Sequence, residues 1–211
     1  MAISPKHTKA DPKGFYLAED QDQLIERYDD AATVYDAAME SDVGWRGHLA
    51  LADVVARLVD PTATLCDAGA GTGMLGDQLA ERGFTTMDAN DLSEGMLEIA
   101  KTKGIYRDCQ LMELGKSLAY ASNTYDAVTV CGVFTPNHAP ASSLDELVRI
   151  TKPGGLILYT LRADEEPPEF AGKHLELEQA GSWRLVEAGE PFPSIGSEPH
   201  IRHRCWVWRV S

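Results

Sequence analysis

The chain has 211 residues, of which 44% are hydrophobic and 25% are charged, and its formal net charge is −14 with histidine neutral. This length and composition suit one folded domain that buries a full-sized core. Nucleic-acid binding usually leaves a basic footprint, and the acidic balance disfavours it. The apolar runs, such as residues 156–159, are far shorter than the roughly 20 residues that span a bilayer. We expect neither a nucleic-acid nor a membrane partner.

The four cysteines predict buried thiols rather than a metal site. Cys66, Cys109, Cys131 and Cys205 form no CxxC pair, and none has a histidine at zinc-finger spacing. Free cysteine behaves as a small buried hydrophobe, which indicates a reducing compartment. The first 20 residues contain no apolar run of the secretory type. We therefore expect a cytoplasmic protein without a metal.

The first 60 residues predict a tail or lid followed by two helices. Residues 1–20 have no periodic pattern. From Asp22, apolar side chains recur every three or four positions and predict a helix; they are Leu24, Tyr28, Ala31, Tyr35 and Met39. A second helix over 45–59 has an apolar face and ends at Asp60-Pro61.

Residues 61–162 alternate between strand and helix patterns. The strands are short and apolar, and they are expected at 64–66, 85–89, 109–112, 127–131 and 156–161. Helices are expected at 74–82, 93–103 and 143–151. Ser93 caps the second of these, and a capping box of Ser143 and Glu146 opens the third. Such alternation is typical of a parallel sheet that helices cover on both faces.

Residues 163–211 continue the same predicted domain as one helix and two strands. The helix is expected at 170–180 and the strands at 183–188 and 201–210, with a long loop between them. The sequence shows no internal repeat and no second domain, so we expect residues 1–211 to form a single unit.

The strongest functional signal is a glycine-rich turn after the first strand. Residues 65–73 read Leu-Cys-Asp-Ala-Gly-Ala-Gly-Thr-Gly, at the place where an open α/β sheet binds its ligand. Glycine there lets a ligand approach the backbone because no Cβ stands in the way. Asp91 follows Gly71 by 20 residues, at the end of the second strand, where a carboxylate can accept hydrogen bonds from ribose hydroxyls. The pattern predicts a cofactor that contains a nucleoside.

The position of the glycines favours S-adenosylmethionine over a dinucleotide. Residues 71–76 satisfy the G-x-G-x-x-G pattern of NAD-binding proteins. The glycines of a dinucleotide site begin directly at the end of the strand, whereas this strand ends at Cys66 and Asp67. The Asp67 carboxylate would repel a pyrophosphate, and it suits the ammonium and sulfonium of S-adenosylmethionine.

Four motifs in this order resemble class I S-adenosylmethionine-dependent methyltransferases. They are residues 67–73 after the first strand, 91–97 after the second, 125–128 at the fourth and 152–155 before the fifth. Upstream, Tyr28-Asp29 and Tyr35-Asp36 are similar to the paired Tyr-Asp helix of many small methyltransferases. With Trp45-Arg46, the pattern most resembles the methyltransferase-like proteins named after the Williams–Beuren syndrome region.

The resemblance implies a Rossmann-like α/β fold. Its doubly wound, seven-stranded sheet would be mostly parallel, with an antiparallel C-terminal hairpin and a helical N-terminal cap. It also implies that Asp67 helps to hold the cofactor ammonium and that Asp91 binds the ribose hydroxyls. The remaining implied cofactor contacts are Gly69, Ala70 and Gly71 along the methionine and ribose, Leu92 and Met112 beside the adenine, and Glu113 near its amino group.

The acceptor side of the site is less specific in the sequence. Methyl transfer from a sulfonium is an in-line displacement, in which a protein mainly aligns the acceptor and excludes water. The acceptor would lie beyond the fourth strand, where His138 is a candidate general base or a surface histidine without a role. Tyr28 and Tyr35 share a helix face. There they would either form a lid over the methionine end of the cofactor or pack onto the sheet. Arg46 would pair with the cofactor carboxylate or lie at the surface.

Three functions remain open at this point. The first is a methyltransferase for a small-molecule acceptor, because only about 50 residues follow the fifth strand. The second is an NAD(P)-linked Rossmann oxidoreductase, which the position of the glycines disfavours. The third is a protein that binds S-adenosylmethionine without transferring its methyl. Neither the acceptor atom (O, N or S) nor the oligomeric state follows from the sequence.

Overall fold

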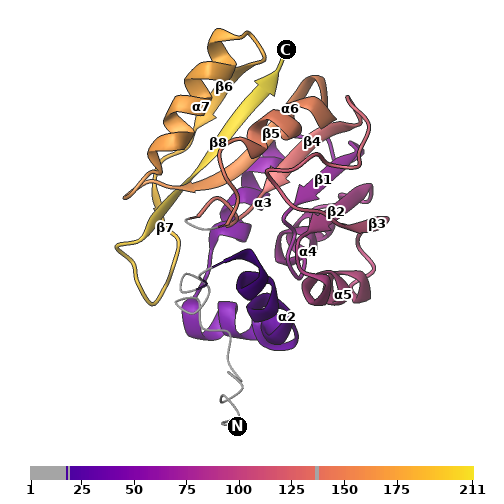
Figure 1. Cartoon of the computed structure of the whole chain (residues 1–211), viewed down its shortest axis with the longest axis vertical. Coiled ribbons are helices and arrows are strands. Elements are labelled where there is room, and N and C mark those ends of the chain that lie inside the picture. The colour runs from indigo at the N-terminus through magenta and orange to yellow at the C-terminus, as the bar shows by residue number, and fades with distance from the viewer. Residues whose placement is uncertain (1–17, 19, 136–137) are drawn as a thin grey trace.

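The structure is a computed structural model that describes residue 18, residues 20–135 and residues 138–211 (Figure 1). The tail or lid predicted over residues 1–20 therefore lies almost entirely outside the described residues. Among the described helices, none is both long and apolar enough to cross a membrane.

Two helices and a π-helical turn precede the sheet. Helix α2 (Gln21–Ala38) begins after Asp20, whose Oδ1 accepts a hydrogen bond from the Gln23 amide at 2.9 Å. The π-helical segment η1 (Met39–Val43) continues it and ends at Gly44, which has φ +68°. Helix α3 (Gly47–Leu58) follows. Both predicted helices are confirmed, and the π turn between them was not predicted.

The sheet has the strand order β3-β2-β1-β4-β5-β8-β6, with β1 to β5 parallel and β8 antiparallel to both neighbours (Figure 1). The strands are β1 (Leu65–Ala68), β2 (Met87–Asp91), β3 (Asp108–Leu111), β4 (Tyr125–Val130), β5 (Thr151–Arg162), β6 (Trp183–Ala188) and β8 (Arg202–Val210). A two-residue strand, β7 (Phe192–Pro193), pairs with the start of β8. The Rossmann-like sheet with its antiparallel C-terminal pair is confirmed, and β7 adds an eighth strand inside the predicted loop.

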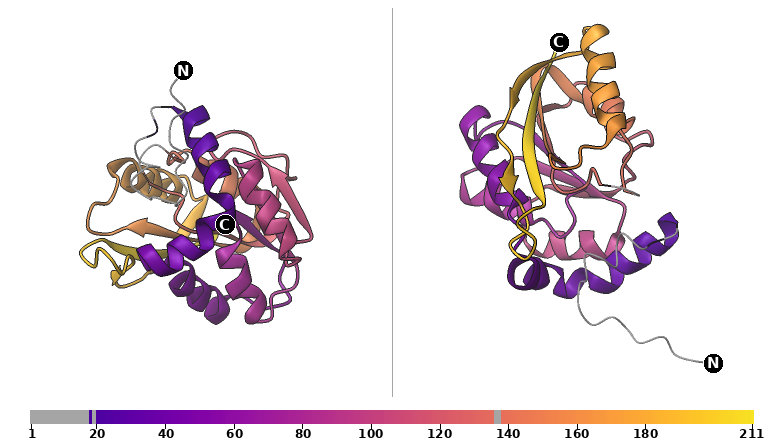
Figure 2. Two further views of the ribbon diagram at one scale, coloured as in Figure 1. Left: turned by 90° about the horizontal axis from the view of Figure 1, so that it is seen from below. Right: turned by 90° about the vertical axis from the view of Figure 1, so that its left-hand side faces the viewer.

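Helices cover both faces of this sheet, as the strand pattern predicts. The remaining helices are α4 (Met74–Glu81), α5 (Glu94–Thr102), α6 (Ser143–Ile150) and α7 (Pro168–Gln179). Leu65 of β1 belongs to the core shared with α3 and α4, whereas Cys66 and Ala68 belong to the core shared with α6 and α7. Successive residues of one strand thus reach opposite cores, and the right-hand view of Figure 2 shows α3 and α7 on opposite sides of the sheet.

The capping box predicted at the start of α6 is wrong. The N-cap residue is Ser142, without a side-chain cap, and the buried Ser143 Oγ has no hydrogen-bond partner among the residues that the structure describes. The Glu146 carboxylate instead accepts hydrogen bonds from the Arg149 guanidinium at 2.7 Å and from the Leu118 amide at 2.8 Å. A charged partner one turn away competes successfully for the carboxylate because charge-assisted hydrogen bonds are stronger than a neutral cap.

Candidate active site

The main pocket lies beyond the carboxyl ends of β1, β2 and β4, where the strand order changes direction. Such a switch point leaves a crevice between neighbouring loops, which is where open α/β sheets bind ligands. The glycine turn, the end of β2 and the loops after β3 and β4 line it, and α2 and α3 add further side chains. Every predicted site residue except Arg46 lines the pocket; they are Tyr28, Tyr35, Asp67, Gly69, Ala70, Gly71, Asp91, Leu92, Met112, Glu113 and His138.

Two positions of the turn, 69 and 71, are occupied by glycine for different structural reasons. Both lie in the left-handed region, Gly69 with φ +71° and Gly71 with φ +57°. A Cβ on Gly69 would come within 2.5 Å of Val133 Cγ2, whereas a Cβ on Gly71 would meet none of the described atoms within 4 Å. The Gly69 and Ala70 amides donate hydrogen bonds to the Asn90 carbonyl at 2.8 and 2.9 Å. The turn is therefore fixed against β2, and the space over Gly71 is left open to the pocket.

Asp91 joins the two loops that face the pocket. Its Oδ2 accepts a hydrogen bond from the Gly71 amide at 2.8 Å, and its Oδ1 accepts one from the Ser93 amide at 3.0 Å. Burial raises the pKa of this carboxyl group, and the two amide hydrogen bonds oppose that rise. A carboxylate held in this way keeps unused lone pairs that can accept further hydrogen bonds.

Asp67 is buried at the end of β1 and is held by two hydroxyl groups. The Tyr106 hydroxyl donates a hydrogen bond to Oδ2 at 2.6 Å, and the Thr129 hydroxyl donates one to Oδ1 at 3.1 Å. Only 1% of the residue is exposed. Burial raises its pKa to about 6. Neither hydroxyl was predicted, because no local pattern links residues 106 and 129 to the strand end.

We expect ionisation of Asp67 to lower the stability of the free protein as the pH rises. Its pKa is about 6 in the folded protein and 3.8 in the unfolded reference, so its ionisation opposes folding as pH rises through that window. At about 1.4 kcal/mol per pKa unit, the effect reaches roughly 3 kcal/mol. We expect the unfolding free energy of the wild type, relative to Asp67→Asn, to fall between pH 4 and 7. Urea titrations of both proteins measure the difference, and a constant difference contradicts the expectation.

The two aspartates of the Tyr-Asp pairs attach α2 to the loops around the pocket. Asp29 Oδ1 accepts hydrogen bonds from the Ser93 hydroxyl at 2.5 Å and from the Gly95 amide at 2.8 Å. Asp36 accepts a hydrogen bond from the Thr72 hydroxyl of the glycine turn and an ion-pair contact from Lys103. A seven-residue spacing places both aspartates on one side of the helix. The repeated Tyr-Asp pattern signalled this helix, but the sequence analysis assigned no role to the aspartates.

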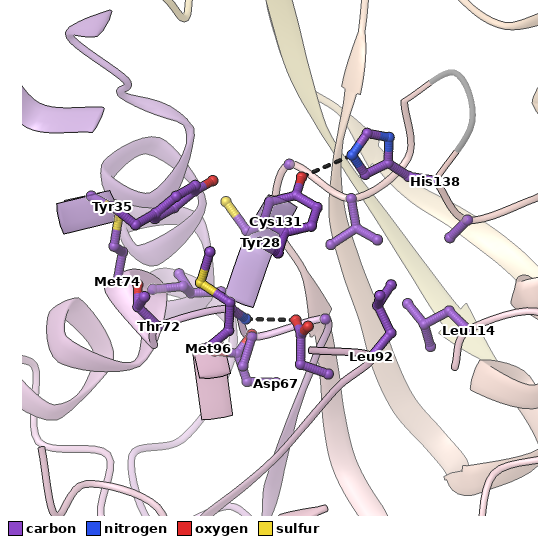
Figure 3. A pocket seen from close by; sticks show the side chains of 18 of the residues that line it. Tyr28, Tyr35, Asp67, Thr72, Met74, Leu92, Met96, Leu114, Cys131 and His138 are labelled. Atoms are coloured by element: carbon purple, nitrogen blue, oxygen red, sulfur yellow. Dashed lines mark hydrogen bonds between the residues drawn. The ribbon is translucent and has the colours of Figure 1, made fainter. Parts of the chain in front are cut away.

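The tyrosines of the same pairs line the pocket. The Tyr28 hydroxyl lies 2.8 Å from His138 Nε2, and Figure 3 shows it pointing at the histidine ring. The Thr135 hydroxyl lies 3.0 Å from His138 Nδ1. The rings of Tyr28 and Tyr35 are 6.2 Å apart. The structure thus connects α2 with the loop after β4 at the edge of the pocket, and both ring nitrogens of His138 have partners.

The predicted adenine contacts lie just after β2 and β3. Leu92, Met112 and Glu113 all line the pocket, and the Met112 amide donates a hydrogen bond to the Asp91 carbonyl at 2.9 Å. Glu113 forms an ion pair with Lys116 at 2.5 Å. Leu114, Met96 and Ala139 extend the apolar part of the lining. In the part of the chain that the structure describes, no three acidic, histidine or cysteine side chains group closely enough to hold a metal ion.

Arg46 does not line the pocket, which corresponds to the surface position given as its alternative. It is exposed and is the N-cap residue of α3, and its neighbours Trp45 and His48 line the pocket instead. The reason is helical phase: α3 begins at Gly47, so the side chain that turns inward is His48. The sequence analysis did not identify His48 as a pocket residue, because the pattern over residues 45–59 did not fix the residue at which this helix starts.

Comparisons with known proteins agree with this geometry. A methyltransferase domain family matches residues 66–159. Human methyltransferase-like protein 27 is 33% identical over 174 residues, which cover 79% of this chain and 70% of the human protein. The chain belongs to this family of S-adenosylmethionine-dependent methyltransferases. The resemblance drawn from its four motifs is thereby confirmed, and the methyltransferase cofactor is S-adenosylmethionine rather than NAD(P).

A further relative and two solved structures are similar to this methyltransferase. The demethylmenaquinone methyltransferase of Renibacterium salmoninarum is 30% identical over 142 residues, which cover 65% of this chain and 57% of that enzyme. Two solved structures share the fold: a SAM-dependent methyltransferase from Aquifex aeolicus (TM-score 0.57, 22% identity, 79% of this chain and 93% of that one) and magnesium protoporphyrin IX methyltransferase from Synechocystis with bound SAM (TM-score 0.58, 18% identity, 93% and 88%).

The pocket of this methyltransferase fits its cofactor in three respects. The open space over Gly71 gives a nucleoside access to the backbone. The buried carboxylate of Asp67 and the half-buried carboxylate of Asp91 suit a ligand with cationic groups and ribose hydroxyls. His48 also lines the pocket, and its buried Nδ1 has no hydrogen-bond partner among the described residues.

Proposed function

We propose that this methyltransferase transfers the methyl group in line to a small-molecule acceptor whose proton is taken by His138. The observation that carries the proposal is the hydrogen bond between the Tyr28 hydroxyl and His138 Nε2 at the pocket that also contains Asp67 and Asp91. It brings a residue of α2 and a residue of the loop after β4 to one point of the wall. A base at that point is available to an acceptor inside the pocket.

The enclosure by α2 supports a small acceptor. Asp29 and Asp36 attach this helix to the loops on either side of the cofactor pocket, and its two tyrosines line the wall. Named relatives act on small molecules: one family of bacterial enzymes on demethylmenaquinone, and a structural neighbour on magnesium protoporphyrin IX. An acceptor that is a folded macromolecule would have to displace α2 and its anchoring hydrogen bonds.

The cofactor, when bound, supplies a methyl group on a sulfonium that is already activated for displacement. In this proposal Asp91 binds the ribose hydroxyls and Asp67 faces the ammonium. Gly69, Ala70 and Gly71 allow the ligand to approach the turn. Leu92, Met112 and Glu113 line the adenine side. These residues bind and orient, so they lower the entropic part of the barrier rather than supply a chemical group.

His138 would hold the acceptor proton. Thr135 fixes the ring through Nδ1, and the Tyr28 hydroxyl occupies the position next to Nε2. An acceptor hydroxyl, amine or thiol that replaces the Tyr28 contact could pass its proton to Nε2 as the methyl group arrives. Tyr28 and Tyr35 would exclude water from the reacting atoms, which prevents competing solvation of the nucleophile.

Replacing His138 with asparagine tests this assignment. We expect kcat to fall about a hundredfold, within the range of general-base effects, while the affinity for S-adenosylhomocysteine stays unchanged. The assay follows S-adenosylhomocysteine formed with a metabolite extract and then with single compounds.

The exposed His200 provides a matched control, because His200→Asn makes the same change far from any pocket contact. It should leave kcat unaltered. If His138→Asn keeps full kcat, His138 only closes the pocket and the base is elsewhere. If no small molecule supports product formation, the proposed acceptor class is wrong.

A further inference from the structure

Trp45 is a pocket residue that the proposed mechanism leaves without a task. It lies between η1 and α3, its side chain is partly exposed, and it lines the pocket. Its ring lies close to the start of the loop after β4, since a Cβ on Gly132 would be 3.1 Å from Trp45 Cζ2. Gly132 also lines the pocket. Trp45 therefore borders the region beyond β4 in which the proposed function places the acceptor.

The backbone at Trp45 is held by η1 on one side and by the loop between β7 and β8 on the other. Its amide donates a hydrogen bond to the Met39 carbonyl at 2.9 Å. It also forms an isolated antiparallel β-bridge with Ile195, and the following amide, of Arg46, donates to the Ser194 carbonyl at 2.9 Å. Two segments that are about 150 residues apart in the chain thus fix the position of this residue.

The ring of Trp45 is supported from behind by β8. The imidazole of His203 lies nearly perpendicular to it, with the ring centroids 5.2 Å apart. His203 is itself buried, and its Nδ1 lies 2.7 Å from the Ser194 hydroxyl. A side chain that is held through both its backbone and its ring offers a preformed surface, because a ligand does not have to order it on binding.

Aromatic side chains of α2 border a second point of the loop after β4. The Tyr28 and His138 rings are 5.8 Å apart in an edge-to-face arrangement, and Tyr35 lies 6.2 Å from Tyr28. Aromatic pairs gain stability beyond the burial of their area when they stack with an offset or meet edge to face. An acceptor on this loop therefore has aromatic surfaces from α2 and from Trp45 available to it, which favours a flat ring over a saturated one.

We propose that Trp45 is a specificity-determining residue whose ring packs against an aromatic acceptor beside Gly132. The acceptor would be a compound that carries its nucleophilic atom on or next to an aromatic ring. Trp45 selects and orients this compound and takes no proton, because the indole nitrogen is only a donor. The inference deepens the proposed function and rests on it for the position of the acceptor.

Fluorine NMR of protein labelled with fluorotryptophan tests the contact. The chain has four tryptophans, and the resonance that is lost in Trp45→Phe belongs to Trp45. With S-adenosylhomocysteine bound, added 1-naphthol should shift this resonance. Its fully saturated counterpart, decahydro-1-naphthol, keeps the hydroxyl group without an aromatic face and should bind about tenfold more weakly. This measurement uses the wild-type fold, so it does not depend on the stability of a variant.

Calorimetric titration of variants that are saturated with S-adenosylhomocysteine measures the selectivity. Trp45→Leu keeps an apolar side chain and loses the ring, so it should weaken binding of 1-naphthol about threefold to tenfold and that of the saturated compound less than about twofold. Trp45→Phe should keep most of the preference. Trp206→Leu is the matched control, since Trp206 is also partly exposed but packs on His174 and does not line the pocket. It should change neither affinity.

Three results would overturn the inference. An unmoved Trp45 resonance, or equal binding of the two compounds by the wild type, would show that no aromatic acceptor packs on this ring. Equal weakening of both compounds in Trp45→Leu would show that Trp45 only fills space. A loss of more than about tenfold in affinity for S-adenosylhomocysteine in that variant would assign Trp45 to the cofactor. The proposed function has a separate readout, which is methyl transfer by the wild type to compounds of a metabolite extract, so either can fail without the other.

Discussion

Replacing Gly71 with alanine is expected to weaken binding of S-adenosylhomocysteine by roughly a hundredfold while the free protein stays folded. The added Cβ meets none of the described atoms within 4 Å, so the free protein bears only the cost of φ +57°, about 1–2 kcal/mol. Gly71 lines the pocket, so we expect the added methyl group to meet the bound ligand. Calorimetry with S-adenosylhomocysteine and thermal unfolding of the free protein measure the two effects separately.

Gly69→Ala is the matched variant, because it makes the same change two residues earlier. Its main expected effect is on the stability of the free protein, whereas that of Gly71→Ala is on ligand affinity. Its Cβ would lie 2.5 Å from Val133 Cγ2 and the residue has φ +71°, so we expect a loss of about 2–4 kcal/mol in the unfolding free energy of the free protein. If Gly71→Ala binds the ligand like the wild type, the cofactor does not approach this turn.

Asp91→Ala is expected to reduce cofactor affinity by about two to three orders of magnitude. The substitution removes the predicted acceptor for the ribose hydroxyls. It also removes the hydrogen bonds from the Gly71 and Ser93 amides, which in the wild type position two loops at the pocket. Titration with S-adenosylhomocysteine measures the loss, and adenosine, which carries the same ribose, should lose affinity by a similar factor.

Asp88→Ala on the same strand separates this effect from a loss of stability. Asp88 accepts hydrogen bonds from Arg107 at 2.7 Å and from the Tyr125 hydroxyl at 3.0 Å, and it lies outside the pocket lining. Its removal should lower the unfolding midpoint without changing ligand affinity. An Asp91→Ala protein that keeps wild-type affinity would remove the ribose role from this carboxylate.

The alternation of strands and helices was predictable because it is written in local patterns. The strand of residues 65–68 and the helix capped by Ser93 lie within one or two residues of their expected positions, which is the usual uncertainty at element ends. The glycine turn and Asp91 followed from the same pattern, since the carboxyl ends of parallel strands meet at one edge of the sheet, whereas Leu92, Met112 and Glu113 came from the family resemblance.

What the sequence did not predict depends on contacts between distant segments. Glu146 follows the pattern of a capping box, but Arg149 and the Leu118 amide take its carboxylate. Tyr106 and Thr129 reach Asp67 from other strands or loops, and no local spacing announces them. Arg46 was predicted as a candidate contact, but the start of α3 leaves it exposed and places Trp45 and His48 in the pocket lining.

The attachment of α2 has a consequence for how this enzyme can be altered. Tyr28 and Tyr35 of this helix line the part of the pocket that an acceptor would meet. Its aspartates accept hydrogen bonds from Thr72, Ser93 and Gly95. Any redesign of the helix for a bulkier acceptor is expected to shift the loops that we propose to contact the cofactor. We therefore expect the range of acceptors and the affinity for the cofactor to change together. A variant with a broader range of acceptors will need compensating changes at Asp29 or Asp36 to keep its cofactor affinity.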